Sequence, residues 1–313
     1  MKYFKILLVL LCIIVFITSC SSNKKDENSI TVGVMSSMDY LPLAVAEREG
    51  YFTKHGVTVK LQKFLSANER DAAIQSGVVD GAVTDYTSAA LVQAGGFNLK
   101  LVSKCQAPFY IVAGSKSGVN NLSELKGKKI AVSQNTVIDF CVDMALESVA
   151  LNQNDVEKVE VNKIPLRLEM MRNNKIDATG LPNPFALIAK NDNCKLLISM
   201  DSLEYTVTGI IFTEKAIEAK ADAIKKMYAA YNEGAEYLRT HSVEDIKDIL
   251  TKDLGFPQPL LDQVQIPAYT SAQSPTSSDK DIQAVIKWLI DRKLIEDSFD
   301  VNNLIDSNLA ITE

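Results

Sequence analysis

Strand patterns alternate with helix patterns through most of this 313-residue chain, and this alternation constrains the fold more than any other feature of the sequence. The alternating run at residues 30–34 is followed by a helix pattern that begins at Pro42 and ends at Gly50. The same rhythm starts again at residues 128–132. Strands and helices at this spacing predict a mainly parallel sheet with helices on both faces. Two such blocks predict an α/β fold of two lobes, each with a doubly wound sheet, and a ligand cleft between the lobes.

This pattern divides the chain into a leader and two lobes. We expect residues 1–19 to be a signal peptide, and residues 20–29 to be a lipidated cysteine followed by a tether. Residues 30–115 together with residues 205–313 are expected to form lobe 1, and residues 116–204 are expected to form lobe 2. The last part of the chain is mostly helical in pattern, and we expect it to return over lobe 1.

Local signals predict individual element boundaries. Ser66 opens a capping box, which predicts a helix over residues 67–76. Thr136 is predicted to cap a second helix that runs towards Leu151. Residues 159–164 are predicted to form a strand.

Residues 1–20 have the pattern of an exported lipoprotein. Lys2 and Lys5 precede an apolar run over residues 6–17, which is shorter than the roughly 20 residues of a membrane-spanning helix. The segment Ile17-Thr18-Ser19-Cys20 resembles the bacterial lipobox, in which the cysteine is lipidated and becomes the mature N-terminus. We therefore expect lipidation of Cys20 and a location in the cell envelope, on the extracytoplasmic side of a membrane. An ordinary soluble signal peptide is the alternative.

Charge and residue usage disfavour several functions. Without the two lysines of the signal, 31 basic residues face 39 acidic ones, so the mature chain is acidic. This balance disfavours nucleic-acid binding and extended contact with anionic lipid, so we expect membrane contact through the lipid anchor only. His55 and His241 are the only histidines, and Cys105, Cys141 and Cys194 lack CxxC spacing, so we expect no metal site and no cofactor. These three cysteines are expected to be buried thiols, with one disulfide to Cys194 as the alternative.

Four motifs, in order along the chain, resemble one family of solute-binding proteins. The segment AEREGYF at residues 46–52, followed by HGVTV at residues 55–59, is similar to the family opening A-x-E-x-G-Y-F-x-x-x-G-V-x-V, although Arg48 stands where that pattern has its acid. The family comprises substrate-binding components of ABC importers for aliphatic sulfonates, nitrate, taurine and thiamine-pyrimidine precursors. The other motifs are SGVVDG at residues 76–81, LKGKKIAV at residues 125–132, and KIDA at residues 175–178 with Pro182 and Pro184 beyond it.

The resemblance covers residues 30–294 and implies a periplasmic-binding-protein type II-like fold without catalytic activity. It implies capture of a small solute by lobe closure, and delivery to an ABC permease that a separate ATPase drives. We expect a monomer. One alternative is a ligand-sensing lipoprotein that does not transport. Another is an enzyme similar to a fungal pyrimidine-synthesis enzyme of the same fold, which resembles a single-turnover system that relies on histidine.

Candidate ligand-binding residues lie on loops after the predicted strands and on the second connection between the lobes. Ligands of open α/β sheets bind beyond the carboxyl ends of the strands, beside helix N-termini. The candidates are Ser36, Ser37, Met38, Asp39, Tyr40, Ser66, Asn68, Asp85, Tyr86, Gln106, Asn135, Thr136, Asn183, Tyr205 and Thr206.

The candidate residues favour one ligand class over another. Asp39 and Asp85 would repel a bare anion and favour a ligand with amine or ring N–H donors, and Tyr40 and Tyr86 could stack on a flat ring. The predicted loops contain no arginine, which disfavours sulfonate and nitrate, although Arg167 at the start of a lobe 2 helix would partly restore them. We therefore expect a nitrogen heterocycle, such as a pyrimidine precursor of thiamine, with an aliphatic sulfonate second.

Overall fold

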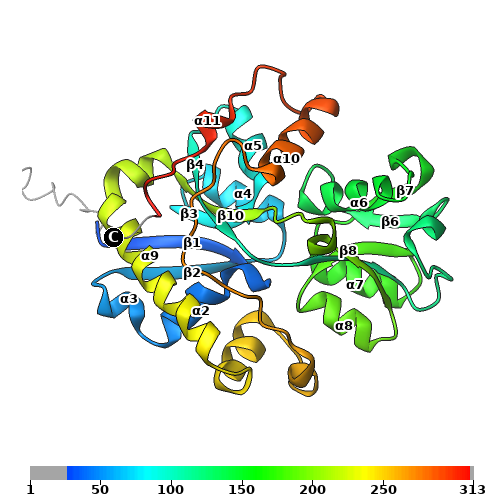
Figure 1. Ribbon diagram of the computed structural model, residues 1–313, viewed down its shortest axis with the longest axis horizontal. Coiled ribbons are helices and arrows are strands. Elements are labelled where there is room, and N and C mark those ends of the chain that lie inside the picture. The colour runs from blue at the N-terminus through cyan, green and yellow to red at the C-terminus, as the bar shows by residue number, and fades with distance from the viewer. Residues whose placement is uncertain (1–26, 311–313) are drawn as a thin grey trace, which may run out of the picture.

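The computed structural model describes residues 27–310, and these contain two five-stranded sheets that lie side by side (Figure 1). The first sheet has the strand order β2-β1-β3-β10-β4. Its strands are β1 Ser29–Met35, β2 Thr58–Phe64, β3 Gly81–Asp85, β4 Leu99–Cys105 and β10 Thr208–Thr213.

The second sheet repeats this arrangement with the order β7-β6-β8-β5-β9. In each sheet one strand runs against the other four: β10 pairs antiparallel with β3 and β4, and β5 pairs antiparallel with β8 and β9. The predicted α/β fold with two mainly parallel sheets is therefore confirmed. The strands of the second sheet are β5 Phe109–Ala113, β6 Lys129–Val132, β7 Glu157–Glu160, β8 Ala178–Pro182 and β9 Lys195–Ser199.

The chain passes between the sheets twice, at residues 106–108 and at residues 200–207. The first passage comes earlier than the expected boundary at residue 115. The reason is that β5 pairs with β8 and β9, so this strand belongs to the second sheet. After the second passage, β10 returns to the first sheet and inserts between β3 and β4.

Helices flank both sheets, and several begin where the sequence predicts (Figure 1). The Ser66 hydroxyl accepts a 3.3 Å hydrogen bond from the Glu69 amide, and the Thr136 hydroxyl accepts one of 3.3 Å from the Ile138 amide, so both predicted caps are formed. The helices are α2 Leu41–Arg48, α3 Tyr51–Lys54, α4 Ala67–Gln75, α5 Tyr86–Ala94, α6 Val137–Glu147, α7 Ile164–Arg172, α8 Phe185–Asn191, α9 Glu214–Thr240, α10 Lys280–Asp291 and α11 Val301–Leu304.

Two boundaries differ from the prediction. Helix α6 ends at Glu147 rather than near residue 151. Strand β7 ends at Glu160 rather than at Ile164, because Ile164 already begins α7. Pro165 occupies the first turn of α7, where its missing N–H is not needed, and it was the sequence signal for this helix start.

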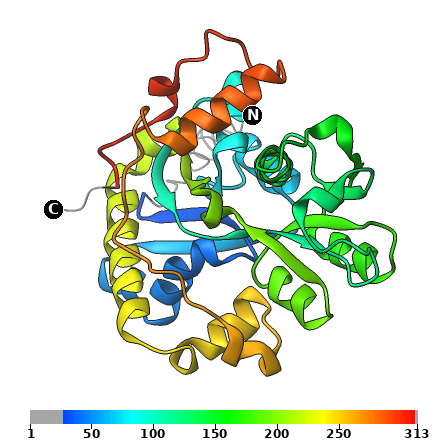
Figure 2. The same cartoon turned by 45° about the vertical axis from the view of Figure 1, so that its right-hand side comes forward.

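The hydrophobic core is continuous between the two sheets. One buried cluster contains Leu101 and Ile211 of the first sheet, Ile111 and Ile130 of the second, and Trp288 of α10. Helix α10 contacts α5 and also lies beside α6, so the C-terminal part covers more than the first sheet (Figure 1, Figure 2). The two sheets are therefore joined by packed side chains as well as by the two chain passages.

Three further expectations concern the cysteines, the N-terminal segment and membrane-spanning helices. Cys105, Cys141 and Cys194 are free and buried, as expected, so the alternative disulfide to Cys194 is not formed. The expected signal peptide and the lipidation residue Cys20 lie outside the described residues, as does most of the tether. In the part that is described, no helix has both the length and the apolar character needed to span a bilayer.

Candidate ligand-binding site

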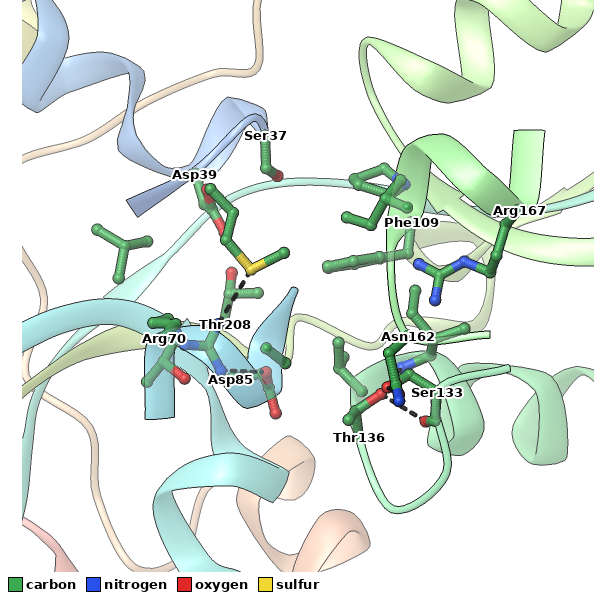
Figure 3. A pocket seen from close by; sticks show the side chains of 18 residues that line it. Ser37, Asp39, Arg70, Asp85, Phe109, Ser133, Thr136, Asn162, Arg167 and Thr208 are labelled. Atoms are coloured by element: carbon green, nitrogen blue, oxygen red, sulfur yellow. Dashed lines mark hydrogen bonds and ion pairs between the residues drawn. The ribbon is translucent and has the colours of Figure 1, made fainter. Parts of the chain in front are cut away.

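A cavity of about 50 Å³ lies between the two sheets (Figure 3). The first sheet contributes residues at or just beyond strand ends, such as Met35 of β1 and Asp85 of β3. The second contributes Ser133 after β6, Asn162 after β7, and Pro182 at the end of β8. This is the position expected for a ligand of a doubly wound sheet. Roughly 10–15 Å³ holds one water, so the space suits a small solute.

Arg70 lies on the wall formed by the first sheet, and acidic side chains surround its guanidinium. This side chain is only 4% exposed. Its Nε lies 2.9 Å from an Asp71 carboxylate oxygen, and its Nη2 lies 3.3 Å from an Asp85 carboxylate oxygen and 2.9 Å from the Ser88 hydroxyl. Asp85 in turn caps α5 by accepting a hydrogen bond from the Ser88 amide. The charge of Arg70 is therefore already balanced within the protein.

Arg167 lies on the opposite wall, and its environment is different. The side chain is 1% exposed, and its one hydrogen bond, of 3.1 Å, is donated by Nη1 to the Val161 carbonyl oxygen. Across residues 27–310, no carboxylate lies within ion-pair distance of Arg167. Burial lowers the pKa of Arg167 to about 10, although nearby Glu160 opposes this shift, so the group stays charged at neutral pH. A buried cation without a carboxylate favours an anionic ligand.

Unpartnered polar atoms are concentrated at this cavity. Five buried side-chain nitrogen or oxygen atoms in the described part of the chain lack a hydrogen-bond partner. Four of them belong to residues that line the cavity, namely Ser37, Asp39, Thr84 and Arg167. Buried polar groups in folded proteins are rarely left unpaired, so these atoms are available to a bound solute or to water in the cavity.

Apolar side chains complete the wall of the cavity. Phe109 begins β5 and its ring projects into the cavity, as Figure 3 shows. Val137 and Ile138 come from the first turn of α6, and Val83 comes from β3. Few polar groups on an apolar wall are typical of a small-molecule site, where the polar groups orient the ligand.

Four of the residues proposed from the sequence line this cavity: Ser37, Asp39, Asp85 and Thr136. The structure places the others elsewhere, for identifiable reasons. Met38, Tyr40 and Tyr86 are part of the hydrophobic core, and Tyr205 packs edge-on against Phe140. The proposed residues that do not line the cavity are Ser36, Met38, Tyr40, Ser66, Asn68, Tyr86, Gln106, Asn135, Asn183, Tyr205 and Thr206.

Some of these residues have other roles in the structure. Ser66 caps α4, and the Asn183 side-chain oxygen accepts a hydrogen bond of 3.2 Å from the Leu187 amide in α8. Gln106 and Thr206 line a separate hollow next to the two passages between the sheets. Ser66 and Asn183 therefore bind helix amides next to the site, whereas Gln106 and Thr206 lie apart from it.

Arg70 and Asn162 line the cavity but are not among the site residues predicted from the sequence. The sequence predicts only a secondary role for Arg167. Arg70 lies one turn beyond the predicted cap Ser66, and helical side chains tilt back towards the N-terminus, which was an available signal. Asn162 was hidden because the strand was predicted to continue to Ile164. The predicted loops contain no arginine, but Arg70 and Arg167 reach the cavity from helices α4 and α7.

Known proteins resemble this chain in sequence and in fold. A putative aliphatic sulfonates-binding protein of Bacillus subtilis is 25% identical over 263 residues, which is 78% of each chain. A putative ABC transporter periplasmic binding protein of Brachyspira hyodysenteriae is 24% identical over 254 residues, 74% of this chain and 72% of that protein.

Solved structures agree in fold over nearly the whole chain. The periplasmic aliphatic sulphonate binding protein SsuA of Escherichia coli has a TM-score of 0.76 at 17% identity, and the match covers 90% of this chain and 99% of SsuA. The desulfurization enzyme DSZB has a TM-score of 0.64 at 12% identity, covering 90% of this chain and 97% of the enzyme. At these identities the likeness establishes the fold alone, and the fold is that of a periplasmic binding protein.

Family membership follows from the sequence. The family described as NMT1/THI5 like matches residues 37–245, which is more than half of the chain. The match includes the second sheet, every strand of the first sheet except β1, and most of the residues that line the cavity. The chain belongs to the NMT1/THI5 like family.

Proposed function

We propose that this protein is the solute-binding component of an ABC importer and that it binds a small solute bearing an oxyanion in the cavity between the sheets. One observation carries the proposal. Four of the five unpartnered buried side-chain atoms of residues 27–310 line this cavity, and one of them belongs to the Arg167 guanidinium. The relatives named as sulfonate-binding and ABC transporter binding proteins support this assignment.

Arg167 favours an oxyanion over the nitrogen heterocycle expected from the sequence. That expectation depended on Asp39, Asp85 and the absence of arginine from the predicted loops, and two arginines from helices line the cavity. Arg70 is bound by Asp71 and Asp85, so Arg167 is the group available to a sulfonate or a similar anion. We therefore propose an aliphatic sulfonate-like solute first and a pyrimidine precursor of thiamine second.

An enzymatic role has less support than binding. DSZB is an enzyme with this fold, so the fold alone does not decide the question. The histidine chemistry of the fungal enzyme would need a histidine at the cavity. His55 instead lies 2.6 Å from a Glu233 carboxylate oxygen, His241 stacks on Tyr237, and neither lines the cavity.

We also propose that the mature protein is a monomer held at the extracytoplasmic side of a membrane by lipid on Cys20. The basic start, the short apolar run and the segment before Cys20 support this proposal. Metabolic labelling with a radioactive fatty acid should mark the wild-type chain and not a Cys20→Ala variant. Equal labelling of both chains would contradict lipidation at this residue.

Thermal unfolding of the full chain against a panel of small solutes tests the proposed function. The panel contains sulfonates, nitrate, aminopyrimidines, riboflavin and amino acids. A solute present at 100 times its dissociation constant should stabilise the protein by about 2.7 kcal/mol. We expect sulfonates to raise the midpoint, and Arg167→Met to abolish that rise. A rise with aminopyrimidines alone would favour the second solute class.

Import and sensing are separated by a cellular measurement. Uptake of the labelled solute should fall in cells that lack the chain and recover when the wild-type chain is restored. Solute binding without any effect on uptake would favour a sensing lipoprotein over an importer component.

A further inference from the structure

The cavity has an acid on one wall and an unpaired arginine on the other. Asp39 lies in the short helix Met38–Tyr40 after β1; it is 7% exposed, and its Oδ1 has no hydrogen-bond partner. Arg167 comes from α7 beside the second sheet, and its Nε has no partner. Figure 3 shows the two side chains on opposite sides of the cavity, with the Phe109 ring between them in this view. A solute that spans the cavity can therefore contact both groups.

Two charged groups face Asp39, and Arg70 has the larger effect on it. Arg70 of α4 attracts the Asp39 carboxylate, whereas Asp85 at the end of β3 repels it. The Arg70 guanidinium is also bound to Asp71 and to Asp85. Asp39 has no ion-pair partner among the described residues, so a cationic group of a bound solute would add to the stabilisation that Arg70 and Ser37 give its carboxylate.

The titratable groups that face Asp39 from other elements stay neutral near pH 7. These are Cys105 of β4, Tyr231 of α9 and Tyr269 in the segment before α10; burial raises the pKa of each well above its ordinary value. Burial raises the pKa of neighbouring Tyr40 as well. Burial also raises the pKa of Asp39, to about 7, although Arg70 opposes this shift. Asp39 is therefore the group in this set that changes its charge around neutrality.

We propose that Asp39 selects solutes by charge: its carboxylate binds the ammonium group of a zwitterionic solute whose oxyanion contacts Arg167, and its neutral acid admits solutes with the oxyanion alone. This inference rests on the proposed function, because it requires a solute in this cavity. The physical reason is the low dielectric of the buried site. A second anion beside a carboxylate is repelled strongly there, whereas an ammonium group is attracted strongly.

Proton exchange on binding to the wild-type full chain tests the inference directly. The probes are 2-aminoethanesulfonate and ethanesulfonate, which differ by one ammonium group. Titration calorimetry at pH 7 in two buffers of different ionisation enthalpy counts the protons that each probe moves. We expect uptake of about half a proton with ethanesulfonate and release of about half a proton with 2-aminoethanesulfonate, because Asp39 is half-ionised before binding.

The pH dependence of affinity gives a second readout with a matched pair of variants. Between pH 6 and pH 8, the dissociation constant should rise about tenfold for ethanesulfonate and fall about tenfold for 2-aminoethanesulfonate. Asp39→Asn should flatten both profiles. Asp262→Asn, which changes an exposed carboxylate that does not line the cavity, should leave both profiles as in the wild type.

The outcomes separate this inference from the proposed function. Binding of both probes with the same sign of proton exchange, or with no exchange, overturns the charge selection and leaves solute binding intact. Opposite profiles that persist in Asp39→Asn also overturn it. If the variant does not fold, the wild-type proton counts still decide. If the two sulfonates and the matched pair 3-aminopropanoate and propanoate all fail to bind from pH 6 to pH 8, the proposed function fails and the charge selection fails with it.

Discussion

Arg70 and Arg167 line the same cavity, but only the charge of Arg70 is balanced by carboxylates. Arg70 has Asp71 and Asp85 as partners, so its removal would leave the buried Asp85 carboxylate without its cation. Arg167 has only a carbonyl oxygen as a hydrogen-bond partner, so its removal takes an unpaired buried charge out of the ligand-free protein. Buried charges without partners destabilise a fold, so the two arginines should affect stability in opposite ways.

Replacing each arginine by methionine tests this difference. Arg70→Met should lower the free energy of unfolding by about 3–5 kcal/mol, because it breaks a buried ion pair from one side. Arg167→Met should leave this free energy unchanged or raise it by roughly 1 kcal/mol, while it abolishes binding of the anionic solute. Urea unfolding of both variants without ligand provides the measurement. Equal destabilisation by the two substitutions would contradict the assignment of Arg167 as the unpaired group.

Asp39 should also make the stability of the ligand-free protein depend on pH. Its pKa is raised to about 7 in the fold from a usual value of 3.8, so the folded state holds more protons than the unfolded state between these values. The free energy of unfolding should therefore fall as pH rises through this window, by on the order of 4 kcal/mol from this residue. Asp39→Asn should lose that part of the slope in unfolding measured from pH 4 to pH 8. A wild-type slope retained in this variant would show that other groups cause the dependence.

The two acids Asp39 and Asp85 were easier to predict from the sequence than the two arginines of the site. Asp85 ends β3 and Asp39 lies in the short helix after β1, and the rule that ligands lie at strand ends identifies such positions. Arg70 and Arg167 lie at the end of the first turns of α4 and α7, so their side chains reach the cavity from helices and not from the loops after the strands. The tilt of helical side chains was a local signal for Arg70, but the meeting of both arginines at one cavity depends on the packing of the whole chain.

Helices α2 and α9 show how closely two elements can approach at a residue without a side chain. A Cβ atom built on Gly234 of α9 would lie 2.2 Å from the carbonyl oxygen of Pro42 and 3.4 Å from the backbone nitrogen of Ala46. Both atoms belong to the backbone of α2. A side chain at Gly234 would therefore have to push the helices apart.

Gly234→Ala should destabilise the protein even though alanine is the better helix former. The substitution gains about 1 kcal/mol of helix propensity, but we expect a net loss of roughly 1–3 kcal/mol because α2 must shift. Glu236→Ala, at an exposed position of the same helix, serves as the control and should change stability by less than about 1 kcal/mol. Thermal unfolding of both variants distinguishes the cases. A stabilised Gly234→Ala protein would mean that the helices separate easily.

Most elements were predictable because their signals are local. Strand periodicity and the caps at Ser66 and Thr136 placed β1, α4 and the start of α6 within a few residues. The end of β7 was missed because the apolar pattern continues into α7, where only Pro165 marks the change. The pairing partners of a strand are not determined by such local signals. The assignment of β5 to the second sheet depends on contacts with β8 and β9, which are distant in sequence.

At the scale of the whole molecule, α10 connects the two sheets through a cluster of charged groups. The Arg292 guanidinium lies 2.8 Å from an Asp143 carboxylate oxygen and 3.1 Å from one of Asp139, and both acids belong to α6. Lys158 of β7 pairs with the same two acids, and the Trp288 N–H donates a 2.9 Å hydrogen bond to Asp143. Because α10 also packs on α5 beside the first sheet, the cluster resists separation of the sheets.

Loosening this cluster should weaken solute binding without altering any residue that lines the cavity. Arg292→Met leaves both acids paired with Lys158 and Asp143 bonded to Trp288, but it removes the two ion pairs to the residue that ends α10, so the separated arrangement of the sheets becomes more populated. We expect about a five- to tenfold loss of affinity and faster amide hydrogen exchange in α6. Lys287→Met removes only an exposed ion pair on the same helix and should change neither quantity. Unchanged affinity in Arg292→Met would mean that the cluster does not influence the cavity.

The insertion of β10 between β3 and β4 also determines when the first sheet can be completed during synthesis. β4 is held by β10, which leaves the ribosome only after all strands of the second sheet. Until then the nascent polypeptide lacks the strand that joins β4 to the rest of its sheet, and pairings so distant along the chain form slowly. Residues 1–20 predict an export signal. If the chain is exported, this delay keeps the first sheet incomplete during synthesis, and an incompletely folded chain can pass through a translocation channel.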